Sequence, residues 1–369
     1  MSLHDTVVIG ASAGGLQALT AIIERLPATL EACVLVVIHT TPSEDGVLPR
    51  VLERVSALPV TFANNGDALK RRHVYVARPD AHLVVTRHGL GLVHGPRENG
   101  FRPAIDPLFR TAARELGPRV IGVILSGALS DGTYGLSLVK HCGGIAIVQD
   151  PGEAIISSMP LSVLKDVDVD HVLRASDIAG AIERLTREDA DAEGGHAMAP
   201  PKDLEPQLRS KETRVAEMQD LFGPPSALTC PDCGGALWEV QDGRVLRYQC
   251  HVGHQYAPDN LEAEQREAVD GALWSAVRVL EEHAELKMRL ARRVKAGGLT
   301  AMSEGFAEGA RDAHEQAQRI RSLLFDSGSG GSAADAPKRV RRTSSSGTAA
   351  DGRRSGRRAA KTRRARRKG

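Results

Sequence analysis

Apolar residues follow two alternating patterns in the first half of the chain. Short runs rich in Val and Ile, with few polar residues among them, are typical of parallel strands that are covered on both faces. Between these runs, apolar residues recur every three or four positions, as they do on the buried face of a helix. Strands are predicted at 7–10, 34–38, 60–62, 74–77, 120–125 and 145–148, and helices at 14–27, 47–55, 105–116, 134–141 and 178–185. The alternation predicts an α/β fold with a doubly wound, mainly parallel sheet over residues 1–187.

One pair of short apolar runs breaks this alternation. The runs at 83–86 and 90–93 are joined only by the turn Arg87-His88-Gly89. A turn this short can connect antiparallel strands but not parallel ones, so we predict an antiparallel hairpin here.

The second half of the chain is divided into smaller units. Acidic residues, Gly and Pro become frequent at 188–228, which we interpret as a linker with one short helix at 215–222. A small, turn-rich module follows at 229–260, and we expect the linker to separate its core from that of the α/β domain. Two stripes with apolar residues three or four apart then predict an antiparallel helical hairpin at 261–325. The stripes are most simply core, the alternative being a surface for dimerisation or for a partner.

The charge of the chain is unevenly distributed. Its net charge is only +2, but residues 338–369 hold 14 Lys and Arg against one acid, and the other 337 residues carry a net charge of −11. Ser, Gly, Ala and Arg dominate 326–369, which we predict to be a disordered basic tail. Such a tail would bind nucleic acid without sequence preference by counterion release, or would be a solvated tail that folds back on the acidic body. Aromatic residues make up 3% of the chain, which argues against a domain that stacks on bases.

Several features favour a cytoplasmic location without membrane insertion. No apolar stretch is long enough to span a bilayer, and residues 1–6 lack the basic region of a signal peptide. The chain has five cysteines, three of them at metal-ligand spacing, which favours a reducing compartment over a disulfide framework.

Three polar residues follow predicted strands of the sheet. Ser12 comes after the first strand, His39 after the second, and Asp131 shortly after the run at 120–125. Ligands and catalysis gather at the carboxyl ends of strands in such sheets. A hydroxyl, an imidazole and a carboxylate at one edge could act as a nucleophile, its base and the group that orients the base. The alternative is that Ser12 and Asp131 only cap helices while His39 is a loop imidazole.

The glycine-rich turn Gly10-Ala11-Ser12-Ala13-Gly14-Gly15 has two interpretations. A dinucleotide-binding turn is disfavoured because Ser12 replaces the central glycine and the second strand ends in His39 rather than in an acid. The same residues fit G-x-S-x-G, a sharp turn that exposes a nucleophile at a helix N-terminus. The chain order Ser, His, Asp nevertheless differs from that of the α/β-hydrolases.

Several separated motifs together resemble a known family. The turn at 10–15, the strand ending in His39, and the segments 102–109, 126–132, 149–151 and 159–160 occur in the order found in the CheB-type catalytic domain of chemotaxis protein-glutamate methylesterases. The resemblance covers about the first 185 residues. It implies a serine hydrolase that removes methyl esters from glutamyl side chains of chemoreceptors, and often deamidates glutamine, without a cofactor. It further implies that Ser12 is the nucleophile, His39 the general base, Asp131 its orienter, and that the Ala128 N–H binds the oxyanion.

The sequence departs from this family pattern at three points. Ala13 stands where threonine is common, and Leu129-Ser130 replace smaller residues. The first strand starts too early to leave room for a receiver domain, so we expect no phosphorelay control in cis and no response to acetyl phosphate. The competing hypotheses are a non-catalytic signalling scaffold and a serine esterase for a substrate outside chemotaxis; the presence of all three triad residues favours an enzyme.

A second motif predicts a metal site. Cys230-x2-Cys233 and Cys250-x3-His254 are two close pairs with 16 residues between them, which is the spacing of a Cys3His zinc ribbon. His251 is the rival fourth ligand. Four protein ligands leave no open position, so we expect a structural zinc ion that this small module needs in order to fold. Such a ribbon could recognise a protein or a nucleic acid, or brace a neighbouring domain.

Overall fold

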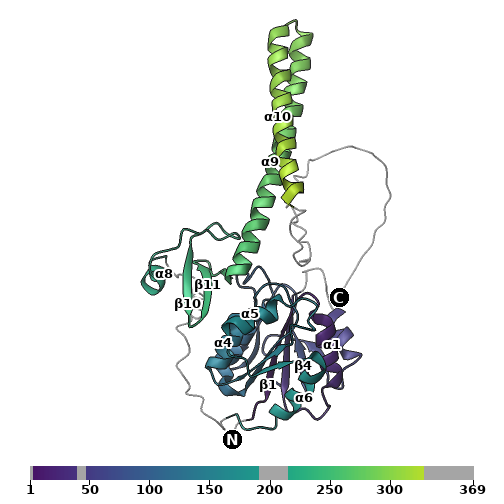
Figure 1. Cartoon of the computed structure of the whole chain (residues 1–369), viewed down its shortest axis with the longest axis vertical. Coiled ribbons are helices and arrows are strands. Elements are labelled where there is room, and N and C mark those ends of the chain that lie inside the picture. The colour runs from purple at the N-terminus through teal and green to yellow at the C-terminus, as the bar shows by residue number, and fades with distance from the viewer. Residues whose placement is uncertain (1–2, 40–46, 191–214, 328–369) are drawn as a thin grey trace, which may run out of the picture. The chain divides into compact units, whose positions relative to one another are not determined.

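The main sheet of the protein is parallel throughout. The computed structural model describes residues 3–39, 47–190 and 215–327 (Figure 1). The main sheet has seven strands in the order β3-β4-β2-β1-β7-β8-β9, and all of its pairs are parallel. The strands are β1 (Thr6–Ala11), β2 (Cys33–Ile38), β3 (Val60–Phe62), β4 (His73–Val76), β7 (Val120–Ile124), β8 (Ile145–Gln149) and β9 (His171–Leu173). The predicted fold class is confirmed.

Helices cover both faces of the main sheet (Figure 1). One core contains residues from α1 (Gly15–Arg25), α2 (Val47–Glu53) and α6 (Ala175–Leu185). The other contains residues from α3 (Ile105–Leu116), α4 (Thr133–His141) and α5 (Ser158–Asp166). Every residue of β1, β2 and β7 is buried, which explains why these strands are apolar without alternation.

The predicted hairpin forms a separate sheet of two antiparallel strands, β5 (His82–Thr86) and β6 (Gly89–Val93). Two elements near the end of the domain were not predicted, namely α5 and β9. Helix α5 buries only Met159, Pro160 and Val163, and β9 is an edge strand of three residues with none of them buried. Their apolar patterns are too short to be recognised by periodicity. A single turn of 3-10 helix, Gly117–Arg119, leads into β7.

The C-terminal elements also follow the predicted order. Helix α8 (Val215–Phe222) precedes a three-stranded antiparallel sheet of β10 (Leu237–Asp242), β11 (Val245–Cys250) and β12 (Gln255–Tyr256). We call the segment 229–257 the ribbon. Helices α9 (Pro258–Ala296) and α10 (Thr300–Ser327) pack on each other as an antiparallel pair joined at Gly297-Gly298. The buried side chains of this pair are mostly small; they include Val277, Ala291, Ala310, Ala313 and Ala317.

The ribbon contacts the α/β domain, contrary to the prediction that the linker separates their cores. Val245 belongs to the core that also contains residues of α3 and α4. The guanidinium of Arg247 lies over the ring of Tyr134, 4.4 Å from its centroid. The ribbon therefore packs against the domain rather than standing apart.

Two predictions concern segments outside the described residues. These are most of the linker, 191–214, and the basic tail beyond residue 327. Within the described ranges, no helix combines the length and the apolar character that a membrane crossing requires.

Candidate active site and metal cluster

The parallel register brings three loops to one edge of the sheet. Strand β1 lies between β2 and β7, with Ala11 beside Ile38 and Gly10 beside Ile124. The chain adds strands on one side of β1 and then returns to add β7 on the other side. Loops on the two sides of such a switch point diverge and leave room for a ligand between them.

Ser12, His39 and Asp131 form a chain of hydrogen bonds at this edge. His39 Nδ1 lies 2.9 Å from Ser12 Oγ, and His39 Nε2 lies 2.7 Å from Asp131 Oδ2. An ionised carboxylate can only accept, so Nε2 carries the proton and Nδ1 is free to accept the Ser12 hydroxyl proton. The ring nitrogens thus have the opposite assignment to the serine protease template, in which Nε2 faces the serine.

Asp131 is buried and held by several donors. Besides His39, the backbone N–H of Ile105 donates to its Oδ2 at 2.7 Å, and Asn99 Nδ2 donates to its Oδ1 at 2.8 Å. The N–H of Asp106 also donates to Oδ1, at 3.3 Å. Burial acts to raise the pKa of Asp131, but the hydrogen bonds and the charge of the imidazole outweigh it and leave the pKa below its ordinary value. The carboxylate that faces His39 is therefore ionised.

A second buried carboxyl lies beside the first. Asp106 accepts from the N–H of Gly135 at 2.7 Å and from Asn99 Nδ2 at 3.0 Å. Its burial, together with the nearby charge of Asp131, raises the pKa of Asp106 well above its ordinary value. The two acids share the amide of Asn99, and their pKa values are shifted in opposite directions.

This raised pKa predicts a pH dependence of stability. An unfolded aspartate has a pKa of about 3.9, so between that value and the higher pKa of folded Asp106 the folded state binds more protons. The free energy of unfolding contributed by this group therefore falls as the pH rises through that interval. We expect Asp106→Asn, which is neutral at every pH, to flatten this fall. Urea unfolding at a series of pH values measures it, with the exposed Asp177→Asn on α6 as the control. Equal pH dependence in wild type and Asp106→Asn would contradict the prediction.

Close backbone packing holds Ser12 in a tight turn between two loops. The N–H of Ser12 donates to Ser126 O at 3.0 Å, and Ser126 Oγ donates to Ala13 O at 3.0 Å. Gly14 adopts the left-handed conformation, with φ of 74°. A Cβ on Gly127 would lie 2.9 Å from Ser12 Cβ, so only glycine lets the second loop approach the serine this closely.

Two backbone donors are available beside the serine. Among the described residues, neither the N–H of Ala13 nor that of Ala128 has a hydrogen-bond partner. Ala13 follows Ser12, and Ala128 follows Gly127, which packs against Ser12. The Ala128 N–H, which we expect to bind an oxyanion, is therefore not used in a hydrogen bond to the described part of the chain.

Sequence reasoning missed the residues that support the triad. Phe101 stacks on the His39 ring with centroids 3.6 Å apart, and Asn99 and the first N–H groups of α3 hold Asp131. Only the segment 102–109 was singled out, as a family-like motif without a role. An asparagine and a phenylalanine in a polar loop carry no periodic signal, so a single sequence could not have assigned them.

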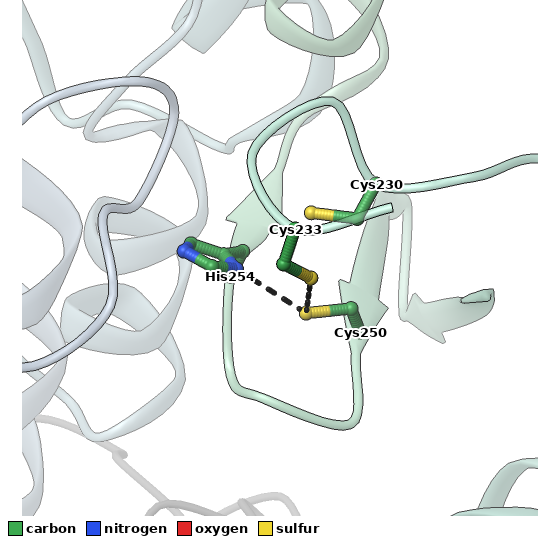
Figure 2. A group of neighbouring side chains, drawn as sticks. All are labelled: Cys230, Cys233, Cys250 and His254. Atoms are coloured by element: carbon green, nitrogen blue, oxygen red, sulfur yellow. Dashed lines mark hydrogen bonds between the residues drawn. The ribbon is translucent and has the colours of Figure 1, made fainter. Parts of the chain in front are cut away.

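The predicted metal ligands also come together. One potential ligand atom from each of Cys230, Cys233, Cys250 and His254 lies within 4.8 Å of all the others (Figure 2). The Sγ atoms of Cys233 and Cys250 are 3.7 Å apart, and Cys250 Sγ is 3.4 Å from His254 Nδ1. Zinc bonds of about 2.3 Å to sulfur and 2.0 Å to nitrogen in a tetrahedron require separations of roughly 3.8 and 3.5 Å. His254, not His251, completes the group, which could hold a metal ion.

Neighbouring polar groups support this cluster. The Tyr256 hydroxyl donates to Asp232 Oδ2 at 2.7 Å and lies 3.5 Å from Cys230 Sγ. Hydrogen bonding between Cys230 and Cys250 lowers the pKa of the former thiol and raises that of the latter. Neighbouring thiolates would repel one another, so the thiols do not all ionise together. A divalent cation would offset that repulsion.

The hydrogen-bonded residues at this edge of the sheet suit one class of enzyme. A serine at a tight strand-to-helix turn, an imidazole and a buried carboxylate are the parts of a serine hydrolase. Here they lie at one edge of a doubly wound parallel sheet.

Comparison with known proteins identifies the family within this class. Residues 7–182 match the CheB methylesterase family. A protein of Leptospira interrogans is 39% identical over 183 residues, which are 49% of this chain and 95% of that protein. The chain belongs to the CheB methylesterase family.

Other relatives share the same domain. The "Protein-glutamate methylesterase/protein-glutamine glutaminase 2" of Methanosarcina mazei is 36% identical over 194 residues, covering 50% of this chain and 53% of that protein. The crystal structure of the Thermotoga maritima CheB methylesterase catalytic domain is 34% identical and covers 50% of this chain and all of that one, with a TM-score of 0.49. The family match at residues 7–182 lies within the α/β domain.

Proposed function

We propose that this protein is a protein-glutamate methylesterase with Ser12 as its nucleophile. The observation that carries the proposal is the hydrogen-bonded chain from Ser12 Oγ through His39 to Asp131. Its relatives named protein-glutamate methylesterase/protein-glutamine glutaminase support the reaction class. The substrate we propose is the methyl ester of a glutamyl side chain in a chemoreceptor or a related signalling protein.

In the proposed mechanism, Ser12 Oγ attacks the ester carbonyl carbon while His39 Nδ1 takes the hydroxyl proton. Asp131 stabilises the resulting imidazolium and keeps its Nε2–H in place. The N–H groups of Ala13 and Ala128 bind the oxyanion. Methanol leaves with the proton from His39, and an acyl-enzyme remains. Water, deprotonated by His39, then releases the glutamate carboxylate and restores Ser12.

The same steps would hydrolyse a glutamine side chain. The leaving group is then ammonia instead of methanol, and it takes its proton from the same His39 nitrogen. Deamidation is therefore proposed as a second activity of this site, in keeping with the glutaminase in the names of the relatives.

Methanol release from a methylated glutamyl protein tests this function. Full-length protein is incubated with such a substrate, and a fluorophosphonate that reacts with activated serines is used to label the enzyme. We expect methanol release and labelling at Ser12. Neither methanol nor label would indicate a non-catalytic scaffold, whereas labelling without methanol release would indicate an esterase for another substrate.

We further propose that the Cys/His cluster holds one structural zinc ion. Cys230, Cys233, Cys250 and His254 would supply all four ligands, and the observed separations suit a tetrahedron. No open position is left, so the ion would stabilise the ribbon and take no part in ester hydrolysis.

A further inference from the structure

One loop contacts two members of the triad. Its residues 98–101 are called the Asn99 loop below. Asn99 is 3% exposed, and its Nδ2 donates to Asp131 Oδ1 at 2.8 Å. The ring of Phe101 stacks on His39 with 11° between the ring planes. A shift of this loop would therefore move both the carboxylate and the imidazole.

The other side of the Asn99 loop is held by residues 255–260, which we call the junction segment because they join the ribbon to α9. The N–H of Asn99 donates to Gln255 O at 2.7 Å, and the N–H of Ala257 donates to Asn99 Oδ1 at 2.8 Å. Asn260 Nδ2 donates to Asn99 O at 3.3 Å. Every polar group of Asn99 that does not face the two aspartates is thus bonded to the junction segment.

Asn260 makes a second connection to the site. Its Oδ1 accepts from Ser130 Oγ at 2.9 Å and from the Ser130 N–H at 3.3 Å. Ser130 immediately precedes Asp131 in the chain. Asn260 has no exposed surface, so water cannot replace these bonds. One amide therefore fixes the triad aspartate from two directions.

These contacts are additions to the family domain. The match to the CheB methylesterase family ends at residue 182. The junction segment lies more than 70 residues further along, yet it contacts the innermost part of the site. Its contribution is thus a property of this chain rather than of the shared domain.

The Cys/His cluster borders the junction segment directly. His254 is the residue before Gln255, and β12 pairs with β11, the strand that ends in Cys250. The Tyr256 hydroxyl donates to Asp232, which lies between the first two cysteines. Both halves of the cluster therefore restrain the start of the junction segment.

We propose, building on the proposed esterase function, that the junction segment positions Asp131 and His39 for catalysis and that metal bound at the Cys/His cluster holds the junction segment in place. The ribbon is then an internal activating element. Asn260 and Asn99 are positioning residues, since they act through the triad and not on the substrate. Loss of the metal would loosen the triad without removing any of its members.

Asn260→Ala in the full-length protein tests the positioning role. We expect kcat to fall about 10- to 100-fold, the scale of a small displacement of catalytic groups, while KM changes little. The acid limb of the pH profile should move to lower pH, because a displaced carboxylate stabilises the protonated imidazole less. Ser275→Ala, whose hydroxyl bonds only within α9, is the control and should leave kcat unchanged. Normal kcat and an unmoved pH profile in a zinc-loaded Asn260→Ala protein would overturn the proposal.

A second variant tests the same positioning role in case Asn260→Ala does not fold. Asn260→Asp keeps the acceptor for Ser130 but loses the donor to Asn99 O. We expect it to have a kcat between those of wild type and Asn260→Ala. A folded Asn260→Asp protein with the kcat of wild type would also count against the proposal.

Zinc removal tests the link to the metal. Chelation of the wild type should lower kcat in step with the measured zinc content, and added zinc should restore it. In Asn260→Ala the same treatment should have a smaller effect, because the hydrogen bonds of Asn260 to Asn99 and Ser130 are already lost. Equal fold-changes in the two proteins, or no change in the wild type despite complete loss of zinc, would contradict the link.

The rate of Ser12 labelling by a fluorophosphonate separates this inference from the proposed function. The reagent needs an activated serine but no methylated substrate. Slower labelling of Asn260→Ala than of wild type supports the positioning role even if methyl esters are not the substrate. Equal labelling rates reject the positioning role, and no labelling of wild type rejects the proposed function itself.

Discussion

Ser12→Ala is expected to reduce methyl-ester hydrolysis by about 10³-fold or more, because no other hydroxyl takes its place against His39 Nδ1. The measurement is methanol release by the full-length protein at saturating substrate. Ser176→Ala, an exposed serine on α6, is the matched control and should retain full activity. Residual activity of Ser12→Ala near that of wild type would show that Ser12 is not the nucleophile.

Substitutions at the other two triad positions are expected to lower turnover, and the one at Asp131 is expected to lower stability as well. His39→Ala removes the base and should lower turnover about as much as Ser12→Ala. Asp131→Asn should lower turnover and also the midpoint of thermal unfolding. The reason is that both carboxylate oxygens accept hydrogen bonds, so an amide NH2 would face donors such as Asn99 Nδ2 or the Ile105 N–H. An Asp131→Asn protein with unchanged turnover would refute the assignment of the orienting role.

Removal of zinc is expected to unfold the ribbon while the main sheet stays folded. Structural zinc sites supply about 10–16 kcal/mol of binding free energy in small modules, which is more than the ribbon's few buried apolar residues can replace. The chain's two tryptophans offer a selective probe, since Trp238 is buried in the ribbon and Trp274 lies on α9. Exposure of Trp238 should shift the emission to longer wavelength on chelation, while Trp274, which is already 45% exposed, should contribute little to the shift.

Hydrogen exchange in the same experiment distinguishes the response of the ribbon from that of the main sheet. Amides of β1 and β7 should remain protected after chelation, because one face of each strand packs in a core that contains no residue of the ribbon. Cys233→Ser should mimic chelation, and Cys142→Ser, a cysteine of the α/β domain outside the cluster, is the control. Metal analysis that finds no zinc in untagged protein would refute the proposed ion, and loss of β1 protection on chelation would refute the independence of the sheet.

Much of the fold could be predicted because it depends on local pattern. The buried strands are apolar on both faces, and the helix at 105–116 was predicted with the bounds that the structure has. Helix α5 and strand β9 were missed because each buries three residues or fewer, too few for a period to be visible.

The sequence by itself determined which groups are proposed to take part in the chemistry. Ser12, His39 and Asp131 follow strand ends, and topology places the ends of parallel strands at one edge of the sheet. The spacing of Cys230, Cys233, Cys250 and His254 likewise predicted their cluster, because short loops leave few ways to arrange two close pairs.

Only the tertiary structure decided how these groups are held. The ring nitrogen that faces Ser12, the raised pKa of Asp106 and the stacking of Phe101 depend on contacts between distant segments. The hydrogen bonds of Asn260 to Ser130 and Asn99 span 130 and 161 residues. Hydrogen bonds over such separations leave no periodic trace in the sequence, since each depends on one polar side chain placed by the packing of two complete units.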